Sequence, residues 1–158
     1  MHKLLLVGPT GSGKTHRLQH LAAAYAADPT AVIWAIDPHT QLVGADRRTG
    51  HDGAAQMLAD ALALVDARAA RSDEHTPTEA EPRVLLLIDE ADELMAQQKP
   101  TVEQLLRLVA TGRRFAVGTA LAVRDTTLQT WQWADLRDHY LSPDTAEHLP
   151  RRHSGEED

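Results

Sequence analysis

The sequence predicts an α/β fold in which helices cover both faces of a mostly parallel sheet, giving three layers. Short apolar runs alternate along the chain with segments of helical periodicity, a pattern typical of βαβ units. One run, at residues 84–88, consists only of large aliphatic residues and indicates a central strand buried on both faces. A glycine-rich turn at residues 8–15 joins the first apolar run to the first helical segment. Together these observations favour parallel strands joined by right-handed crossovers.

The composition is that of a folded domain. The chain has 158 residues, of which 42% are hydrophobic and 25% are charged, and it contains no cysteine. We assign residues 1–142 to one domain and expect residues 143–158 to be a polar, disordered tail. The formal charge of −7 argues against a protein that coats nucleic acid, but not against a local contact with DNA. No apolar run approaches the roughly 20 residues that span a bilayer, so we expect no membrane segment and a cytoplasmic location.

Five strands are expected, each from a short run of aliphatic, branched or aromatic residues. The five runs lie at residues 3–7, 31–36, 84–88, 115–123 and 139–141.

Three helices are expected where apolar residues recur at helical spacing. Arg68, in the second of them, is expected to be solvated. Two segments rich in proline or charge, at residues 37–52 and 72–82, are expected to be loops. The helices are placed at residues 14–27, 54–70 and 101–111.

The glycine-rich turn matches the phosphate-loop pattern G-x-x-x-x-G-K-[ST] in full, with a strand before it and a helix after it. Glycines let the backbone approach phosphate oxygens and point its N–H groups into one concave nest, to which the helix adds its N-terminal dipole. Lys14 supplies charge to the β- and γ-phosphates of ATP, and the Thr15 hydroxyl is placed to bind Mg²⁺. The residues expected to contact ATP are Gly8, Pro9, Thr10, Gly11, Ser12, Gly13, Lys14, Thr15 and His16.

The central aliphatic strand leads directly into two carboxylates, Asp89 and Glu90. In open α/β sheets, ligands bind at the carboxyl ends of the strands. Asp89 is therefore expected to hold Mg²⁺ together with the phosphate-loop threonine. Glu90 is expected to orient and deprotonate the water that attacks the γ-phosphate, a group that a small-molecule kinase does not need. Asp92 and Glu93, which follow, are expected to face solvent.

Several stretches of the sequence resemble the FtsK/HerA superfamily of DNA-pumping ATPases. They are the phosphate loop, residues 32–38, which end in Asp37-Pro38, and residues 85–95, which contain the acidic pair. Residues 110–119 resemble a Gly-Arg step that in this superfamily precedes a strand with a polar sensor residue. The resemblance covers roughly residues 3–123 and implies a motor core of minimal size.

The resemblance implies a P-loop NTPase of the RecA-like additional-strand class that hydrolyses ATP with Mg²⁺. With the five strands numbered in chain order, this class implies the sheet order 5-1-4-3-2, in which the fourth strand is inserted between the first and the third. It also implies that a homo-oligomeric ring couples hydrolysis to the translocation or transfer of double-stranded DNA. In such a ring, Arg113 or Arg114 would reach the γ-phosphate held by a neighbouring subunit. The alternative for both arginines is a basic helix end that interacts with the helix dipole. Thr119 would be the polar sensor, although Ala120 stands where the superfamily commonly has glutamine.

Two other functions remain open at this point. A small-molecule P-loop kinase would need a lid with clustered arginines, and the acidic segment at residues 72–82 has no such cluster. A nucleotide-gated assembly module with low turnover is disfavoured by Lys14, Thr15 and the acidic pair. The missing sensor glutamine nevertheless keeps that alternative open.

Overall fold

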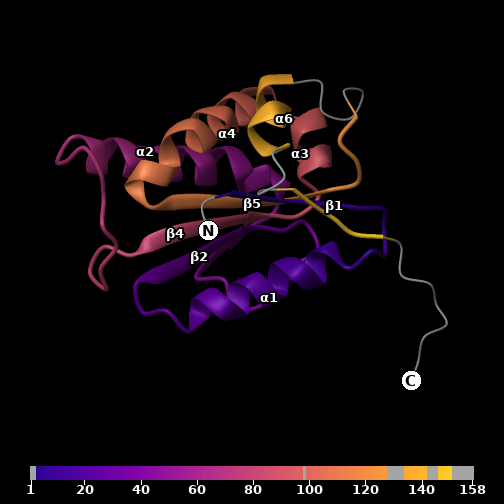
Figure 1. The fold of residues 1–158 in the computed structure, drawn as a ribbon, viewed down its shortest axis with the longest axis horizontal. Coiled ribbons are helices and arrows are strands. Elements are labelled where there is room, and N and C mark those ends of the chain that lie inside the picture. The colour runs from indigo at the N-terminus through magenta and orange to yellow at the C-terminus, as the bar shows by residue number, and fades with distance from the viewer. Residues whose placement is uncertain (1–2, 98, 128–133, 142–145, 151–158) are drawn as a thin grey trace.

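One parallel sheet runs through the centre of the chain, with helices on both of its faces (Figure 1). A computed structural model describes residues 3–97, 99–127, 134–141 and 146–150. In chain order, the strands of this described part are β1 (Lys3–Val7), β2 (Ala31–Ile36), β3 (Arg47–Thr49), β4 (Arg83–Ile88), β5 (Val117–Val123) and β6 (Ala146–His148). They lie side by side in the order β3-β2-β4-β5-β1-β6, and each neighbouring pair is parallel.

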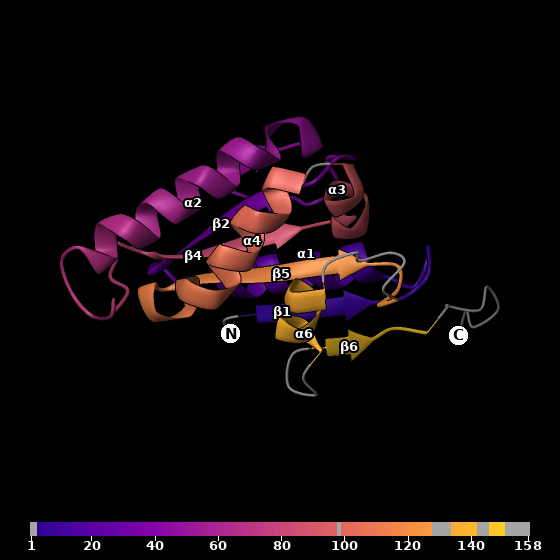
Figure 2. The same cartoon turned by 90° about the horizontal axis from the view of Figure 1, so that it is seen from above.

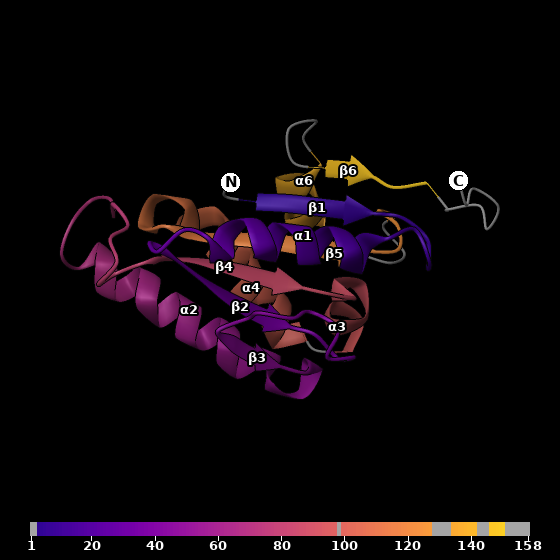
Figure 3. The same cartoon turned by 90° about the horizontal axis from the view of Figure 1, so that it is seen from below.

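The helices form the two outer layers. Among the described helices, α1 (Lys14–Ala26) is the one that covers one face of the sheet, as the view from below shows (Figure 3). The opposite face carries α2 (Ala54–Ala69), α3 (Ala91–Gln97), α4 (Lys99–Thr111) and α6 (Ala134–Tyr140), which lie in front of the strands when seen from above (Figure 2). Two short 3₁₀ helices, η1 (His51–Gly53) and η2 (Gly112–Phe115), precede α2 and β5. None of the helices in the described residues is long and apolar enough to cross a membrane.

The central strand β4 divides the core into two apolar clusters. Val84, Leu86 and Ile88 pack toward α2 and α4, whereas Leu85 and Leu87 pack toward α1. All five side chains are buried, as the uninterrupted aliphatic run predicts for a strand covered on both faces.

The predicted order of the first four strands is confirmed. Read from the other side, β1-β5-β4-β2 is the predicted order 1-4-3-2, with β5 inserted between β1 and β4, and β6 takes the fifth position beside β1. The structure adds β3 beside β2, inside a segment predicted as a loop. This edge strand has no apolar run, and its Arg47 stacks 4.3 Å above the ring of Trp34 while pairing with Asp60 at 2.6 Å. Its position therefore depends on tertiary contacts that the sequence pattern does not show.

The prediction of the last strand at residues 139–141 is wrong. Residues 139 and 140 belong to α6, and the strand that pairs with β1 is β6, in the segment expected to be a polar tail. Three residues suffice there, because Ala146, Glu147 and His148 pair with the already buried residues Leu5, Leu6 and Val7. The rest of the expected tail, residues 151–158, lies outside the described residues.

Candidate functional site

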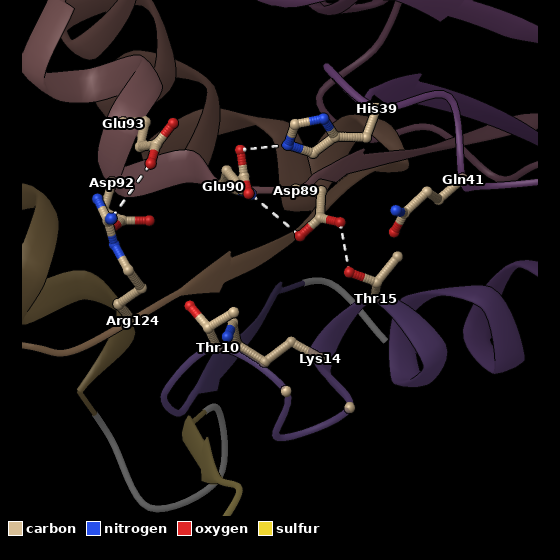
Figure 4. Close-up of a pocket in the computed structure, with 12 residues that line it drawn as sticks. Thr10, Lys14, Thr15, His39, Gln41, Asp89, Glu90, Asp92, Glu93 and Arg124 are labelled. Atoms are coloured by element: carbon tan, nitrogen blue, oxygen red, sulfur yellow. Dashed lines mark hydrogen bonds and ion pairs between the residues drawn. The ribbon is translucent and has the colours of Figure 1, made fainter. Parts of the chain in front are cut away.

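A pocket of about 560 Å³ opens at the edge of the sheet where the strands end (Figure 4). We call this edge the carboxyl edge. The phosphate loop (residues 8–15), the loop after β2, the turn between β4 and α3, and the end of β5 meet there. The volume of the pocket is within the range of pockets that hold small ligands. The lining residues are Thr10, Gly11, Gly13, Lys14, Thr15, His39, Gln41, Asp89, Glu90, Asp92, Glu93 and Arg124.

The phosphate loop has the backbone that its glycines allow. Gly13, the residue before α1, has a φ of 90°, a left-handed conformation that other residues rarely adopt. Gly8 allows a close approach, because a Cβ atom there would lie 2.5 Å from the carbonyl oxygen of Leu149. Within the described chain no side chain caps α1 at Gly13, so the first N–H groups of the helix can serve an anion.

The remaining residues of this region close the turn of the phosphate loop or lie in the first turn of α1. The Ser12 N–H donates to the Pro9 carbonyl at 3.1 Å, which closes a tight turn, and the Ser12 side chain is buried. The side chain of His16 is exposed on α1, where its ring contacts that of His20 rather than lining the pocket. Any contact of His16 with a phosphate would therefore use its backbone N–H group.

Lys14 carries its charge on the pocket side of the phosphate loop (Figure 4). Its ammonium group donates to the carbonyl oxygens of Gly8 at 2.6 Å and of Pro9 at 3.0 Å. Burial lowers the pKa of Lys14, and the nearby carboxylates of Asp89 and Asp92 partly oppose that shift. The cation thus lies where its interactions with an incoming anion are less screened than in water.

Thr15 and Asp89, 74 positions apart in sequence, meet across the pocket. The Thr15 hydroxyl donates to Asp89 Oδ2 at 2.6 Å, and the Glu90 N–H donates to Asp89 Oδ1 at 3.0 Å. Among the described residues no group of three or more histidine or acidic side chains could hold a metal alone. A hydroxyl and one carboxylate nevertheless fit Mg²⁺, which usually binds one or two protein oxygens together with substrate phosphates. Thr15 and Asp89 are the residues that would hold it.

Glu90 occupies the turn between β4 and α3 with a φ of 50°, a strained conformation for a residue with a side chain. Its Oε2 atom lies 3.1 Å from Nε2 of His39, so the two side chains face each other in the pocket. The buried carboxylate of Asp37 shapes the loop that carries His39, accepting N–H bonds from His39 at 3.1 Å and Leu42 at 2.7 Å. The Asp37-Pro38 step thereby positions a group that contacts Glu90.

Arg124 is a pocket residue that the sequence analysis missed. It follows β5 directly, and its guanidinium group contacts Asp92 Oδ2 at 2.6 Å and Glu93 Oε1 at 3.2 Å. The expectation that Asp92 and Glu93 face solvent is wrong for Asp92, whose side chain is only 1% exposed. Arg124 stands after its strand as Asp89 stands after β4, and this position was the signal that could have identified it.

Thr119 lies far from the pocket. It pairs with Lys3 at the start of β1, so about 13 Å of β5 separates it from the carboxyl edge at about 3.3 Å per residue. Its hydroxyl is buried and hydrogen-bonded to the hydroxyl of Tyr140, whose pKa is raised by burial. This placement contradicts the expected role of Thr119 as a sensor.

Arg113 and Arg114 are exposed in η2, at the opposite edge of the sheet, where the strands begin. We call this the amino edge. Both arginines line a second pocket of about 750 Å³, together with His75 and Phe115. Since the length of β5 lies between them and the carboxyl edge, they cannot serve the phosphate loop of their own chain.

Solved structures with a similar fold include large ATPases. The cytoplasmic domain of the type VII secretion ATPase EccC of Thermomonospora curvata matches with a TM-score of 0.67, 19% identity, 87% of this chain and 19% of that chain. EssC (ATPases 2 and 3) of Geobacillus thermodenitrificans matches with a TM-score of 0.69 and 13% identity. The match covers 98% of this chain and 33% of that chain. The pCW3 conjugation coupling protein TcpA, in monomer form with ATPγS, matches with a TM-score of 0.62 and 17% identity. The match covers 87% of this chain and 46% of that chain. The chain thus spans less than half of each, and at these identities the likeness shows the fold alone.

Sequence comparisons identify the family. No curated protein matches the sequence. The AAA domain family, however, matches residues 3–129, which contain the phosphate loop, the acidic pair and Arg124. The chain therefore belongs to the AAA domain family and is a P-loop ATPase.

Proposed function

We propose that this ATPase requires Mg²⁺ and couples ATP hydrolysis to the translocation or transfer of double-stranded DNA. The observation that carries the hydrolytic part is the meeting of Thr15 with Asp89 at 2.6 Å, next to Glu90. A metal-binding hydroxyl, a metal-binding carboxylate and a base stand there on one side of the phosphate loop. A kinase would instead need room and contacts for a second substrate.

The backbone and side-chain groups of the pocket have separate roles in hydrolysis. The backbone N–H groups of the phosphate loop and the Lys14 ammonium group bind the phosphates. Mg²⁺ held at Thr15 and Asp89 would supply further positive charge against the developing negative charge. Water attacks the γ-phosphorus, the bond from that phosphorus to the bridging oxygen of ADP breaks, and Glu90 accepts a proton from the water.

The DNA part of the proposal is supported by sequence resemblance. The stretches that resemble the FtsK/HerA superfamily include Asp37-Pro38. The Asp37 carboxylate accepts N–H bonds from the loop whose His39 contacts Glu90. TcpA, which shares the fold, is described as a conjugation coupling protein. We propose that this chain is a member of that superfamily and works in the cytoplasm. The net charge of −7 would restrict the DNA contact to a local basic surface.

A homo-oligomeric ring would give Arg113 and Arg114 a function. They are exposed at the amino edge, so a neighbouring subunit could present its carboxyl edge to them. We propose that one of them stabilises the γ-phosphate of the neighbour during hydrolysis. The rate per subunit should then rise with protein concentration, and replacing both arginines by alanine should abolish that rise. A rate that is independent of both changes would contradict the assignment.

The test of the proposed function is phosphate release from ATP, measured with no DNA, with single-stranded DNA and with double-stranded DNA. We expect release that depends on Mg²⁺ and is stimulated most strongly by double-stranded DNA. Hydrolysis without any stimulation would overturn the DNA part. Transfer of phosphate to a small acceptor would instead identify a kinase, and stoichiometric binding without turnover would identify an assembly module.

A further inference from the structure

We propose that His16 and His20 form a two-ligand binding site for Zn²⁺, or for another divalent cation that favours imidazole, on the outer side of α1. The observation that carries this inference is the approach of their Nε2 atoms to 2.9 Å. The site goes beyond the proposed function, because it lies outside the ATP pocket and takes a different class of metal from the Mg²⁺ proposed at Thr15 and Asp89.

The geometry of the helix brings the two rings together. Residues four positions apart lie one above the other on the same side of an α-helix. The buried residues of α1 are Leu18 and Ala22, which pack against the sheet. Each histidine lies about 200° around the helix from Leu18, at about 3.6 residues per turn. Both histidine side chains are therefore exposed on the side of α1 that faces away from the sheet.

The distance between the rings suits chelation. Two nitrogens that bind one tetrahedral Zn²⁺ at about 2.0–2.1 Å lie about 3.3–3.4 Å apart. The Nε2 atoms, now 2.9 Å apart, would have to separate by about 0.4–0.5 Å, which a small rotation of two exposed side chains allows. The rings meet at 87° with their centroids 4.4 Å apart, so no stacking is broken when they turn.

A metal can replace the hydrogen bond between the rings. In a pair of neutral imidazoles, one Nε2 donates its hydrogen to the other. When the donating ring changes tautomer, each ring keeps its hydrogen on Nδ1, and both Nε2 lone pairs are free to bind the cation. The contact seen between His16 and His20 is thus the metal-free form of the same pair.

The ligand set indicates the class of metal and the kind of site. Imidazole nitrogen suits Zn²⁺, Cu²⁺ and Ni²⁺, whereas Mg²⁺ prefers oxygen ligands. In the described part of the chain, no third histidine or acidic side chain joins the pair, so water would complete the coordination. We therefore expect an exchangeable site, weaker than the closed four-ligand sites of structural zinc domains.

The test is a calorimetric titration of the untagged, nucleotide-free chain with Zn²⁺ at about pH 7.5, where an ordinary imidazole is mostly neutral. Excess Mg²⁺ is present to occupy oxygen sites. We expect His16→Ala and His20→Ala each to weaken Zn²⁺ binding by at least about tenfold, because losing a ligand should cost no less than losing the outer partner of a ligand. The double variant should be within about twofold of either single variant, since one ring cannot chelate alone. Alanine favours the helix, so α1 should be retained.

Two further variants distinguish a metal ligand from a ring contact. His39→Ala is the matched control, because His39 is also exposed and lies 3.1 Å from Oε2 of Glu90. It should bind Zn²⁺ within about twofold of the wild type. His20→Cys should retain Zn²⁺ binding, because a thiolate is also a Zn²⁺ ligand, whereas a contact that needs two rings would be lost.

A wild-type chain that does not bind Zn²⁺ would overturn the inference. So would an affinity that is unchanged in both alanine variants of the pair, or one that falls as much in His39→Ala. These outcomes leave the proposed ATP hydrolysis untouched, since that activity is measured with Mg²⁺ as the metal.

Discussion

The two edges of the sheet both hold arginines and hydroxyl groups, but they use them differently. At the carboxyl edge, Lys14, Thr15, Glu90 and Arg124 line an open pocket and are partly exposed. At the amino edge, the buried Arg68 donates to the carbonyl oxygens of Phe115 and Pro82, both at 2.6 Å. Pro82 directly precedes β4 and Phe115 ends η2 shortly before β5, so Arg68 links the segments that lead into these two strands.

Position relative to the strand explains this difference. A polar side chain that follows a parallel strand lies at the carboxyl edge, where ligands bind, as Asp89 and Arg124 do. A polar side chain within a strand, such as Thr119, is enclosed by helices and must find a protein partner, here Tyr140. Thus we expect substitutions at the carboxyl edge to affect chemistry, and substitutions of the buried residues Arg68 and Thr119 to affect stability.

The largest effect should follow from Glu90→Gln. The amide cannot accept a proton from water, so phosphate release should fall by about 1000-fold while ATP binding is retained. Single-turnover release and calorimetric ATP binding measure the two properties separately. Hydrolysis at the wild-type rate would remove Glu90 from the mechanism and weaken the contrast between the edges.

Arg68→Met should be the most damaging change at the amino edge. It leaves two partly buried carbonyl oxygens without their charged donor, which should lower the free energy of unfolding by about 3 kcal/mol. Denaturant unfolding measures this loss, and ATP turnover per folded molecule should stay unchanged. Arg71→Met is the control, since its exposed ion pair with Glu81 should contribute less than about 1 kcal/mol.

Thr119→Val separates a structural hydroxyl from a sensor. The substitution leaves the buried Tyr140 hydroxyl without its threonine partner and should cost about 1–2 kcal/mol of unfolding free energy, with no change in ATP turnover. Turnover that falls while stability is maintained would restore the sensor role that the structure contradicts.

His39→Ala should have the smallest effect. The ring is exposed and its contact with Glu90 is solvent-screened, so kcat for ATP should change by less than about fivefold. Steady-state phosphate release would detect it. A change of a hundredfold would mean that His39 takes part in the chemistry rather than only in orienting Glu90.

The sequence alone was sufficient where a function depends on adjacent residues. The phosphate loop needs its glycines, Lys14 and Thr15 in one continuous turn, and the strand before Asp89 is buried enough to be recognised from composition. The strand order followed because an inserted strand brings the ends of β1 and β4 to one pocket.

Other features could not be predicted because distant residues determine them. The strands β3 and β6 are three residues long and depend on pairing with β2 and β1, which no periodicity shows. The ion pair of Arg124 depends on α3 burying Asp92, and the role of Arg68 depends on where β4 and β5 begin. Thr119 lies within β5 rather than after its end, so its hydroxyl meets Tyr140 and not the pocket.

The most direct measurement is phosphate release from ATP by the wild-type chain and by Lys14→Ala, at equal folded concentration. The carboxyl edge is an ATP-hydrolysing site only if the ammonium group of Lys14 binds the phosphates there. We expect the wild type to turn over ATP and Lys14→Ala to lose at least about 100-fold, with an unchanged free energy of unfolding. Equal rates in the two proteins would contradict that assignment.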